Sequence, residues 1–261
     1  MAYKYETIKC EVNNKIALVT LNLPKYNILN GQMLRDIRDV MNELKQEADL
    51  RCAIFTGEGD RAFCAGADVG EFTDPTIDDL EEVDVWARGI LTKLANFPIP
   101  TIAAINGYAL GGGLELALAC DIRVASETAK MGLVETSLGM IAGWGGSQRM
   151  VRTIGAGQAK KMMFTADKIS AEKALQIGLV QEVYKAEELI DRTMEMAQKI
   201  AANSPVANRL TKQGVNCYLN QGINDGLDLE RMLDRAAYES EDSKEGMKAF
   251  EEKRTPDFKN K

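Results

Sequence analysis

Three short apolar runs, at residues 52–56, 101–105 and 122–125, most constrain how this chain can fold. Apolar runs of this length, bounded by turn-forming residues, are typical of buried β-strands. Apolar residues with helical spacing lie around them, at residues 31–48 and 85–96. We therefore expect strands and helices to be mixed along the first two thirds of the chain, which indicates an α/β fold.

The two ends of the chain have different patterns. Residues 8–12 and 16–21 flank the turn sequence Asn13-Asn14-Lys15 and predict a β-hairpin. From about residue 145 onward the pattern is mostly helical, with a long helix predicted over 189–200 and the next helix beginning at Ser204-Pro205. Two loops are expected between the first helices, a glycine-rich one at 57–70 and an acidic one at 71–84.

The chain of 261 residues contains no histidine. This excludes Ser-His-Asp and Cys-His catalysis, and every metal site with histidine ligands. General acid–base chemistry must then be done by carboxylates, lysine, tyrosine or cysteine.

Charge and cysteine usage narrow the class of protein further. The formal net charge of −7 and the pI of about 5.0 argue against a nucleic-acid partner, which needs a basic surface. No stretch approaches the ~18 apolar residues that cross a bilayer, so no membrane partner is expected. The five cysteines are scattered without a CxxC pair, and residues 1–13 lack a signal-peptide pattern. We expect a soluble, cytoplasmic protein with reduced and mostly buried thiols.

The glycine-rich segments allow three interpretations. Gly57, Gly59 and Ala62 match a dinucleotide-binding pattern, but that fingerprint needs a helix at its third position, and residues 63–68 have a loop-like pattern. The second interpretation is that the glycines only form turns, which we favour for Gly57 and Gly59. Three consecutive glycines at 111–113 instead indicate close approach of the backbone to another group, because glycine costs backbone entropy.

The third interpretation is an oxyanion hole. Unpaired N–H groups at the start of the helix after residues 111–113, with a second N–H from residues 66–67, could stabilise charge on a thioester oxygen. Glu115 and Glu135 each lie in a largely apolar segment, which predicts burial and a raised pKa. Two such carboxyl groups could hold one water between them as base and acid, although Glu115 could also simply stabilise the helix N-terminus. The sequence alone leaves their proximity open.

Six stretches resemble the signature of the crotonase superfamily, and are most similar to short-chain enoyl-CoA hydratases and methylglutaconyl-CoA hydratases. The resemblance covers essentially the whole chain and is carried by residues 63–68, 106–117, 120–125, 132–135, 143–149 and 246–254. It implies a crotonase-type ββα spiral over residues 1–200 and a helical C-terminal trimerisation region over 201–261. A homotrimer or homohexamer is the implied assembly.

The resemblance also implies catalytic roles. The N–H groups of Ala67 and Gly112 would form the oxyanion hole. Glu115 would activate the water as base, Glu135 would supply the proton as acid, and the N–H of Gly143 would lie beside the water. No metal and no separate cofactor is implied, because coenzyme A is part of the acyl-CoA substrate.

Further residues are implied in binding the CoA and acyl parts of the substrate. The backbone around Ala65 would hold the adenine, while Phe250 and Lys253 would reach the CoA of a neighbouring subunit. The superfamily often has a lysine shortly after Asp68, which residues 69–71 lack, so Lys25 is a candidate for the missing phosphate contact. Trp144 is bulky for its position, and it either fills the core or forms a wall of the acyl pocket.

The occupied pair of glutamates favours hydration of a 2-enoyl-CoA, a reaction of fatty acid β-oxidation. Double-bond isomerases of the superfamily generally need only one of the two positions, so an isomerase is the alternative. A hydratase specific for a branched or cyclic enoyl-CoA is a further alternative. A non-catalytic scaffold of the same fold is the third possibility, and the intact glutamates argue against it.

Overall fold

The computed structural model describes residues 2–68, 70 and 77–261, and its larger sheet organises the chain. This seven-stranded sheet has the order β1-β2-β3-β4-β6-β8-β11. It is antiparallel from β1 to β3 and parallel from β3 to β11. Its strands are β1 (Ala2–Lys4), β2 (Ile8–Asn13), β3 (Ile16–Leu21), β4 (Cys52–Gly57), β6 (Thr101–Ile105), β8 (Ile122–Ser126) and β11 (Glu182–Tyr184).

A smaller four-stranded sheet has the order β10-β9-β7-β5. It consists of β5 (Ala62–Cys64), β7 (Tyr108–Leu110), β9 (Lys130–Gly132) and β10 (Ile169–Ser170). The next α-helices after β5, β7 and β9 are α2 (Ile77–Ala95), α3 (Gly112–Ala119) and α4 (Gly146–Thr165). The chain thus repeats one unit three times, as β4-β5-α2, β6-β7-α3 and β8-β9-α4. This repeat is the expected spiral of ββα units.

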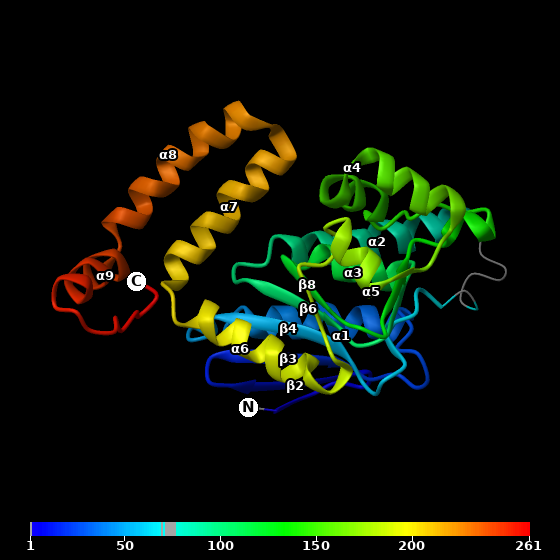
Figure 1. Cartoon of the computed structure of the whole chain (residues 1–261), viewed down its shortest axis with the longest axis horizontal. Coiled ribbons are helices and arrows are strands. Elements are labelled where there is room, and N and C mark those ends of the chain that lie inside the picture. Colours follow the sequence, from blue (N-terminus) through cyan, green and yellow to red (C-terminus); the bar gives the residue numbers. More distant parts are fainter. Residues whose placement is uncertain (1, 69, 71–76) are drawn as a thin grey trace.

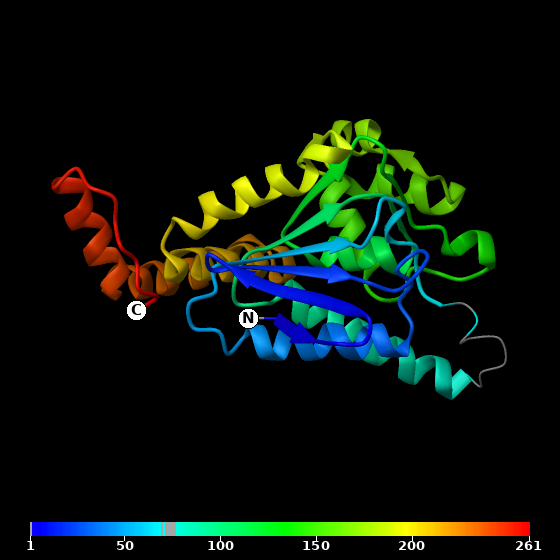
Figure 2. The same cartoon turned by 90° about the horizontal axis from the view of Figure 1, so that it is seen from below.

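Helices cover both faces of the large sheet. Figure 2 shows α1 (Gly31–Leu44) below the sheet and α6 (Leu189–Ala201) above it. The central strands β4 and β6 are therefore buried at every position, which explains their continuous apolar sequences. The main core lies on the side of α1, α2 and α3, and a smaller core lies between the sheet and α6.

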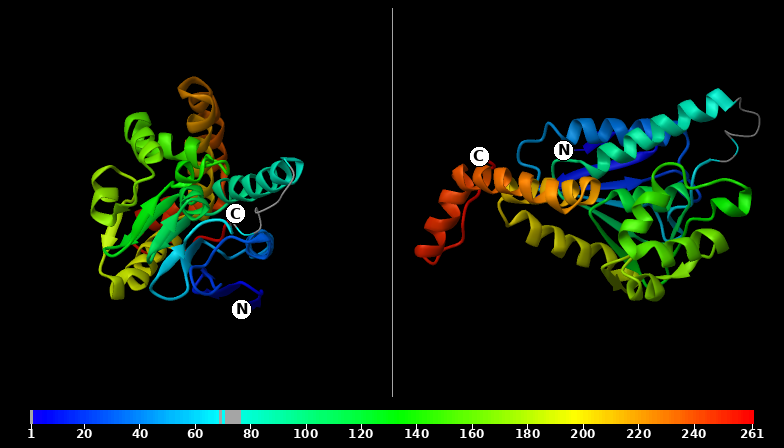
Figure 3. Two further views of the ribbon diagram at one scale, coloured as in Figure 1. Left: turned by 90° about the vertical axis from the view of Figure 1, so that its right-hand side faces the viewer. Right: turned by 90° about the horizontal axis from the view of Figure 1, so that it is seen from above.

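Residues 205–261 form a helical arm that extends from this body (Figures 1 and 3). It consists of α7 (Pro205–Gln221), α8 (Ile223–Glu239) and α9 (Glu241–Glu251), and it follows the short helices α5 (Ala171–Gln176) and η3 (Ala186–Glu188) and the helix α6. As predicted, Ser204 caps α7, accepting a hydrogen bond from the N–H of Ala207, and Pro205 is its first residue.

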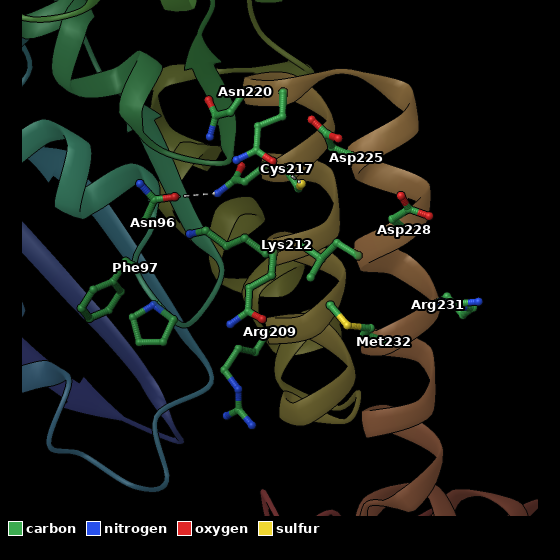
Figure 4. A pocket seen from close by; sticks show the side chains of 15 residues that line it. Asn96, Phe97, Arg209, Lys212, Cys217, Asn220, Asp225, Asp228, Arg231 and Met232 are labelled. Atoms are coloured by element: carbon green, nitrogen blue, oxygen red, sulfur yellow. Dashed lines mark hydrogen bonds between the residues drawn. The ribbon is translucent and has the colours of Figure 1, made fainter.

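A half-buried lysine is among the residues that join the arm to the body. The ammonium group of Lys212 on α7 lies 2.7 Å from the carboxylate of Asp121 and donates to the carbonyl of Ile99 at 3.2 Å. Lys212 is one of the residues that line a hollow of about 720 Å³ between α7, α8 and the turn at Asn96 and Phe97. Figure 4 shows these side chains. Charged groups of both signs line this hollow, and none of the predicted site residues is among them.

The structure differs from the sequence predictions at three boundaries. Helix α1 ends at Leu44 rather than at residue 48. Strand β5 lies within the predicted glycine-rich loop, where its three apolar residues were too few to form a recognisable pattern. Helix α2 begins at Ile77, within the predicted acidic loop. The acidic residues that indicated a loop, such as Glu81 and Glu82, instead occupy the exposed side of this helix. Residues 69 and 71–76 lie outside the described residues. Gly70 occupies the position of the missing lysine, and its N–H donates to the carboxylate of Asp68 at 2.9 Å.

Three other sequence expectations have a clear outcome. Because Ala62 begins strand β5 and not a helix, the dinucleotide-binding fingerprint is not formed, and that interpretation is wrong. All five cysteines are free, and four of them are buried, as predicted. None of the helices in the described ranges combines the length and the apolar character that a membrane span requires.

Candidate active site

The glycine run lies where strand β5 ends against the start of helix α3. Gly111 precedes the helix with φ +50°, a left-handed conformation that glycine adopts readily. A Cβ atom on Gly113 would overlap the carbonyl oxygen of Cys64. The glycines therefore allow the loop after β5 to lie directly against the N-terminus of α3.

Two backbone N–H groups come together at this junction. The nitrogen of Ala67 lies 3.4 Å from the position that a Cβ on Gly112 would occupy. Leu29 fixes this loop, since its N–H donates to the carbonyl of Gly66 at 2.8 Å and its carbonyl accepts from the N–H of Asp68 at 3.1 Å. Among the described residues, no acceptor is found for the N–H of Ala67 or of Gly112. Both groups are therefore available to a bound oxygen atom.

Glu115 lies in the first turn of α3 and is only 2 % exposed. Its Oε1 accepts a hydrogen bond of 2.7 Å from the N–H of Gly146, at the start of α4. A side chain on Gly146 would collide with the Glu115 carboxyl group, so glycine is needed there too. Burial raises the pKa of Glu115 from 4.5 to about 7; the N–H of Gly146 opposes this rise, and the charge of Glu135 adds to it.

Glu135 begins the short helix η2 (Glu135–Leu138), on the other side of the glycine run. Its Oε1 lies 3.2 Å from the position of a Cβ on Gly111, which places the carboxyl group against the start of α3. Its Oε2 is buried and has no hydrogen-bond partner among the described residues. Burial raises the pKa of Glu135. A buried oxygen without a partner is costly in a folded protein and is typical of a group that meets a ligand.

Both carboxyl groups line one cavity of about 450 Å³, together with Ala67 and Gly112. The sequence left the proximity of Glu115 and Glu135 open, and the structure brings them together. Exposed apolar side chains form part of the rim, namely Leu138, Met140 and Ile141. The cavity thus combines two carboxyl groups, free N–H donors and an apolar entrance.

Gly143 and Trp144 line the same cavity. The indole of Trp144 is 5 % exposed, and its N–H donates to the carboxylate of Asp84 at 2.7 Å. Its six-membered ring lies against Gly112, because Cζ3 is 2.9 Å from the position of a Cβ there. Trp144 is therefore both well packed and part of the cavity wall. The sequence had left these two interpretations as alternatives.

The residues predicted to bind CoA are only partly brought to the cavity. Ala65 lines it, and its N–H donates to the carbonyl of Tyr26 at 3.0 Å. Lys25, next to Tyr26, lines a separate hollow together with Arg61. Phe250 is 85 % exposed on α9, and Figure 1 shows α9 at the end of the molecule away from α2 and α4. Lys253 lies two residues after the end of α9, and neither tail residue lines the cavity of its own chain.

Two residues near the site were missed by the sequence reasoning. Asp84 was assigned to a solvated acidic loop, and nothing in that run distinguishes it from its acidic neighbours. Arg149 donates to the carbonyl of Trp144 at 3.0 Å. Burial lowers the pKa of Arg149, while the nearby charge of Glu115 raises it.

Within the described ranges, no group of three or more cysteine, aspartate or glutamate side chains has an arrangement that could hold a metal ion.

Comparison with known proteins gives a consistent result. Residues 11–261 match the family model for enoyl-CoA hydratase/isomerase. The chain is 40 % identical over 253 residues to the short-chain-enoyl-CoA hydratase of Clostridium acetobutylicum, covering 96 % of this chain and 97 % of the relative. It is 37 % identical over 255 residues to the crotonyl-CoA hydratase of Syntrophomonas wolfei, covering 97 % and 98 %. The crystal structure of enoyl-CoA hydratase from Bacillus anthracis superimposes with a TM-score of 0.95, at 38 % identity, covering 98 % of this chain and 100 % of that one.

Proposed function

Because the chain belongs to the enoyl-CoA hydratase/isomerase family, with the crotonase fold that its sequence predicted, we propose that it adds water to the double bond of a 2-enoyl-CoA thioester. One observation carries the proposal. The carboxyl groups of Glu115 and Glu135 line a single cavity that also contains the unpaired N–H groups of Ala67 and Gly112. Water addition needs a base, an acid and a site for an enolate oxygen, and this cavity contains a candidate for each.

In the proposed mechanism, the thioester oxygen accepts hydrogen bonds from Ala67 and Gly112. These bonds strengthen as negative charge develops on that oxygen, and so they favour the enolate over the ground state. Gly112 lies in the first turn of α3, where the helix dipole adds a partial positive charge. Glu115, held by the N–H of Gly146, takes a proton from water as the water oxygen bonds to Cβ.

Glu135 then gives its proton to Cα, which turns the enolate back into a thioester. Exchange with solvent then removes the proton from Glu115 and returns a proton to Glu135. The two carboxyl groups are thereby restored, and the net reaction adds one water. This cycle needs one ionised and one protonated carboxyl group at the start. The raised pKa values support that state, because burial and mutual repulsion both oppose two charges in one cavity. Gly143, whose N–H faces no acceptor among the described residues, is the proposed contact for the water.

A spectrophotometric assay tests the proposal. Loss of the enoyl absorbance with crotonyl-CoA is expected for the wild type, and Glu115→Gln and Glu135→Gln should each lower kcat by at least about 100-fold. Glu187→Gln, which makes the same change on the surface, is the matched control. Turnover of a 3-enoyl-CoA without hydration would instead identify an isomerase, and a panel of branched and cyclic enoyl-CoAs tests the remaining alternatives.

We also propose that the enzyme is a homotrimer or homohexamer in which the arm contributes to a neighbouring site. Exposed apolar residues on α8 and α9 support an assembly, namely Ile223, Leu227, Met232, Tyr238, Met247 and Phe250. In this proposal, Phe250 and Lys253 contact the CoA bound to another subunit, while Lys25 and the backbone near Ala65 contact it within the chain. A place in the cytoplasm and a role in β-oxidation stay predictions.

Sedimentation and substrate truncation test the assembly and the CoA contacts separately. Analytical ultracentrifugation should show a trimer or hexamer, and a monomer at micromolar concentration would refute the assembly. Phe250→Ala and Lys253→Gln should raise KM for crotonyl-CoA but not for crotonyl-pantetheine, which lacks the nucleotide. Equal effects on both substrates would contradict a nucleotide contact.

A further inference from the structure

Asp84 places a third carboxylate in the cavity, and the hydration mechanism does not use it. It lies on α2, and its Oδ1 accepts the hydrogen bond from the indole N–H of Trp144 at 2.7 Å. Its Oδ2 lies 3.5 Å from the position of a Cβ on Gly143. Asp84 is therefore an exposed carboxylate next to Gly143 and Trp144, which line the same cavity.

Trp144 is fixed at both ends of its side chain. One edge of the indole lies against Gly112 at the start of α3, and the opposite edge carries the N–H bonded to Asp84 on α2. The carbonyl of Trp144 also accepts a hydrogen bond from Arg149. A rotation of the indole would break the bond to Asp84 and expose an unpaired N–H, which is costly in a largely buried site. Trp144 is therefore a rigid wall between α3 and α2.

The charges around the cavity are all of one sign. Asp84, Glu115 and Glu135 line it, and no lysine or arginine is found among the lining residues in the described part of the chain. The positive charge of Arg149 lowers the pKa of Glu115, but Arg149 does not line the cavity, and its guanidinium donates to the carbonyl of Trp144. A carboxylate at the end of an acyl chain would therefore meet the carboxylate of Asp84 and the ionised member of the glutamate pair, with no cation among the lining residues to offset them. Like charges in a partly buried cavity repel each other.

We propose that the Asp84–Trp144 pair is a selectivity element that admits uncharged enoyl groups and rejects acyl chains ending in a carboxylate. The inference rests on the proposed hydratase function and specifies its substrate class. It separates this enzyme from hydratases of carboxylated acyl-CoAs, such as the methylglutaconyl-CoA hydratases that its sequence also resembles. Selection here is by repulsion of the wrong substrate rather than by added attraction to the right one.

Two substrates of the same shape but different charge test the proposal. Glutaconyl-CoA ends in a carboxylate, and 5-methylhex-2-enoyl-CoA has two methyl groups in place of the carboxylate oxygens. The wild type should prefer the neutral substrate by at least about 100-fold in kcat/KM, since like-charge contacts cost several kcal/mol. Asp84→Asn keeps an acceptor for the indole N–H and removes the charge, and it should reduce this preference by about 10-fold.

A matched variant and a binding measurement complete the test. Glu82→Gln makes the same change in charge on an exposed position of α2 and should leave the preference as it is. The saturated ligands glutaryl-CoA and 5-methylhexanoyl-CoA, compared by calorimetry, should show the same order of affinity without turnover. Equal kcat/KM values for the two substrates, or an unchanged preference in Asp84→Asn, would overturn the inference. Failure to hydrate crotonyl-CoA and the neutral substrate would overturn the proposed function instead, and the binding comparison would still decide on selectivity.

Discussion

The buried carboxyl group of Glu115 should make the stability of this protein fall as the pH rises, and Glu115→Gln should remove that dependence. The group is only 2 % exposed, and burial raises its pKa from 4.5 to about 7. The folded chain therefore binds this proton more tightly than the unfolded chain does. Glutamine cannot ionise, but its amide oxygen can still accept the hydrogen bond from Gly146.

The sign and size of the effect follow from the two pKa values. Below pH 4.5 both states hold the proton, and the stabilisation from its tighter binding in the folded state is fully present. Between pH 4.5 and about 7 the unfolded chain releases the proton while the folded chain keeps it, so the free energy of unfolding decreases. The total loss is about 3 kcal/mol, at 1.36 kcal/mol for each tenfold change in proton affinity.

Urea unfolding at fixed protein concentration, repeated from about pH 5 to about pH 8, measures this effect. The stability of Glu115→Gln relative to the wild type should rise by about 2–3 kcal/mol over that range, because only the wild type pays for ionising the buried group. Glu187→Gln, on the surface, should show no such trend. A difference between Glu115→Gln and the wild type that stays constant with pH would refute the reasoning.

Three further changes test other parts of the structure. Gly112→Ala brings a methyl group to within 2.9 Å of the Trp144 ring and next to the proposed oxyanion donors. Steady-state kinetics should show that kcat/KM falls by about 100-fold. Activity near that of the wild type would argue against an oxyanion hole there. Lys212→Met leaves the carboxylate of Asp121 without its cation, and limited proteolysis should cut between the body and the arm faster than in the wild type. Asp242→Ala removes a buried acceptor of three hydrogen bonds that join α9, the start of α7 and the C-terminal tail. Urea unfolding should show that the free energy of unfolding falls by about 2–4 kcal/mol. An unchanged urea midpoint would refute that role.

Local sequence pattern was sufficient wherever one segment interacts mainly with itself or buries one continuous surface. The hairpin of β2 and β3 and the cap of α7 at Ser204 depend on residues close in the chain, and both were predicted correctly. The continuous apolar runs of β4 and β6 also identified strands covered on both faces. Strand β5 and the start of α2 were missed, because a three-residue strand and an acidic first turn have no clear period.

The sequence by itself determined which chemistry this protein could use. Without histidine, acid–base chemistry is left to groups such as carboxylates, and the glycine run at 111–113 indicates a close approach of the backbone to another group. Only the tertiary structure decided that the two carboxyl groups line one cavity, and that Asp84 joins them there. The physical reason is that local pattern records the burial and conformation of each segment, whereas the contacts among η2, α2 and α3 depend on how separate ββα units pack. Those contacts, and the pKa values that result from them, are properties of the folded chain as a whole.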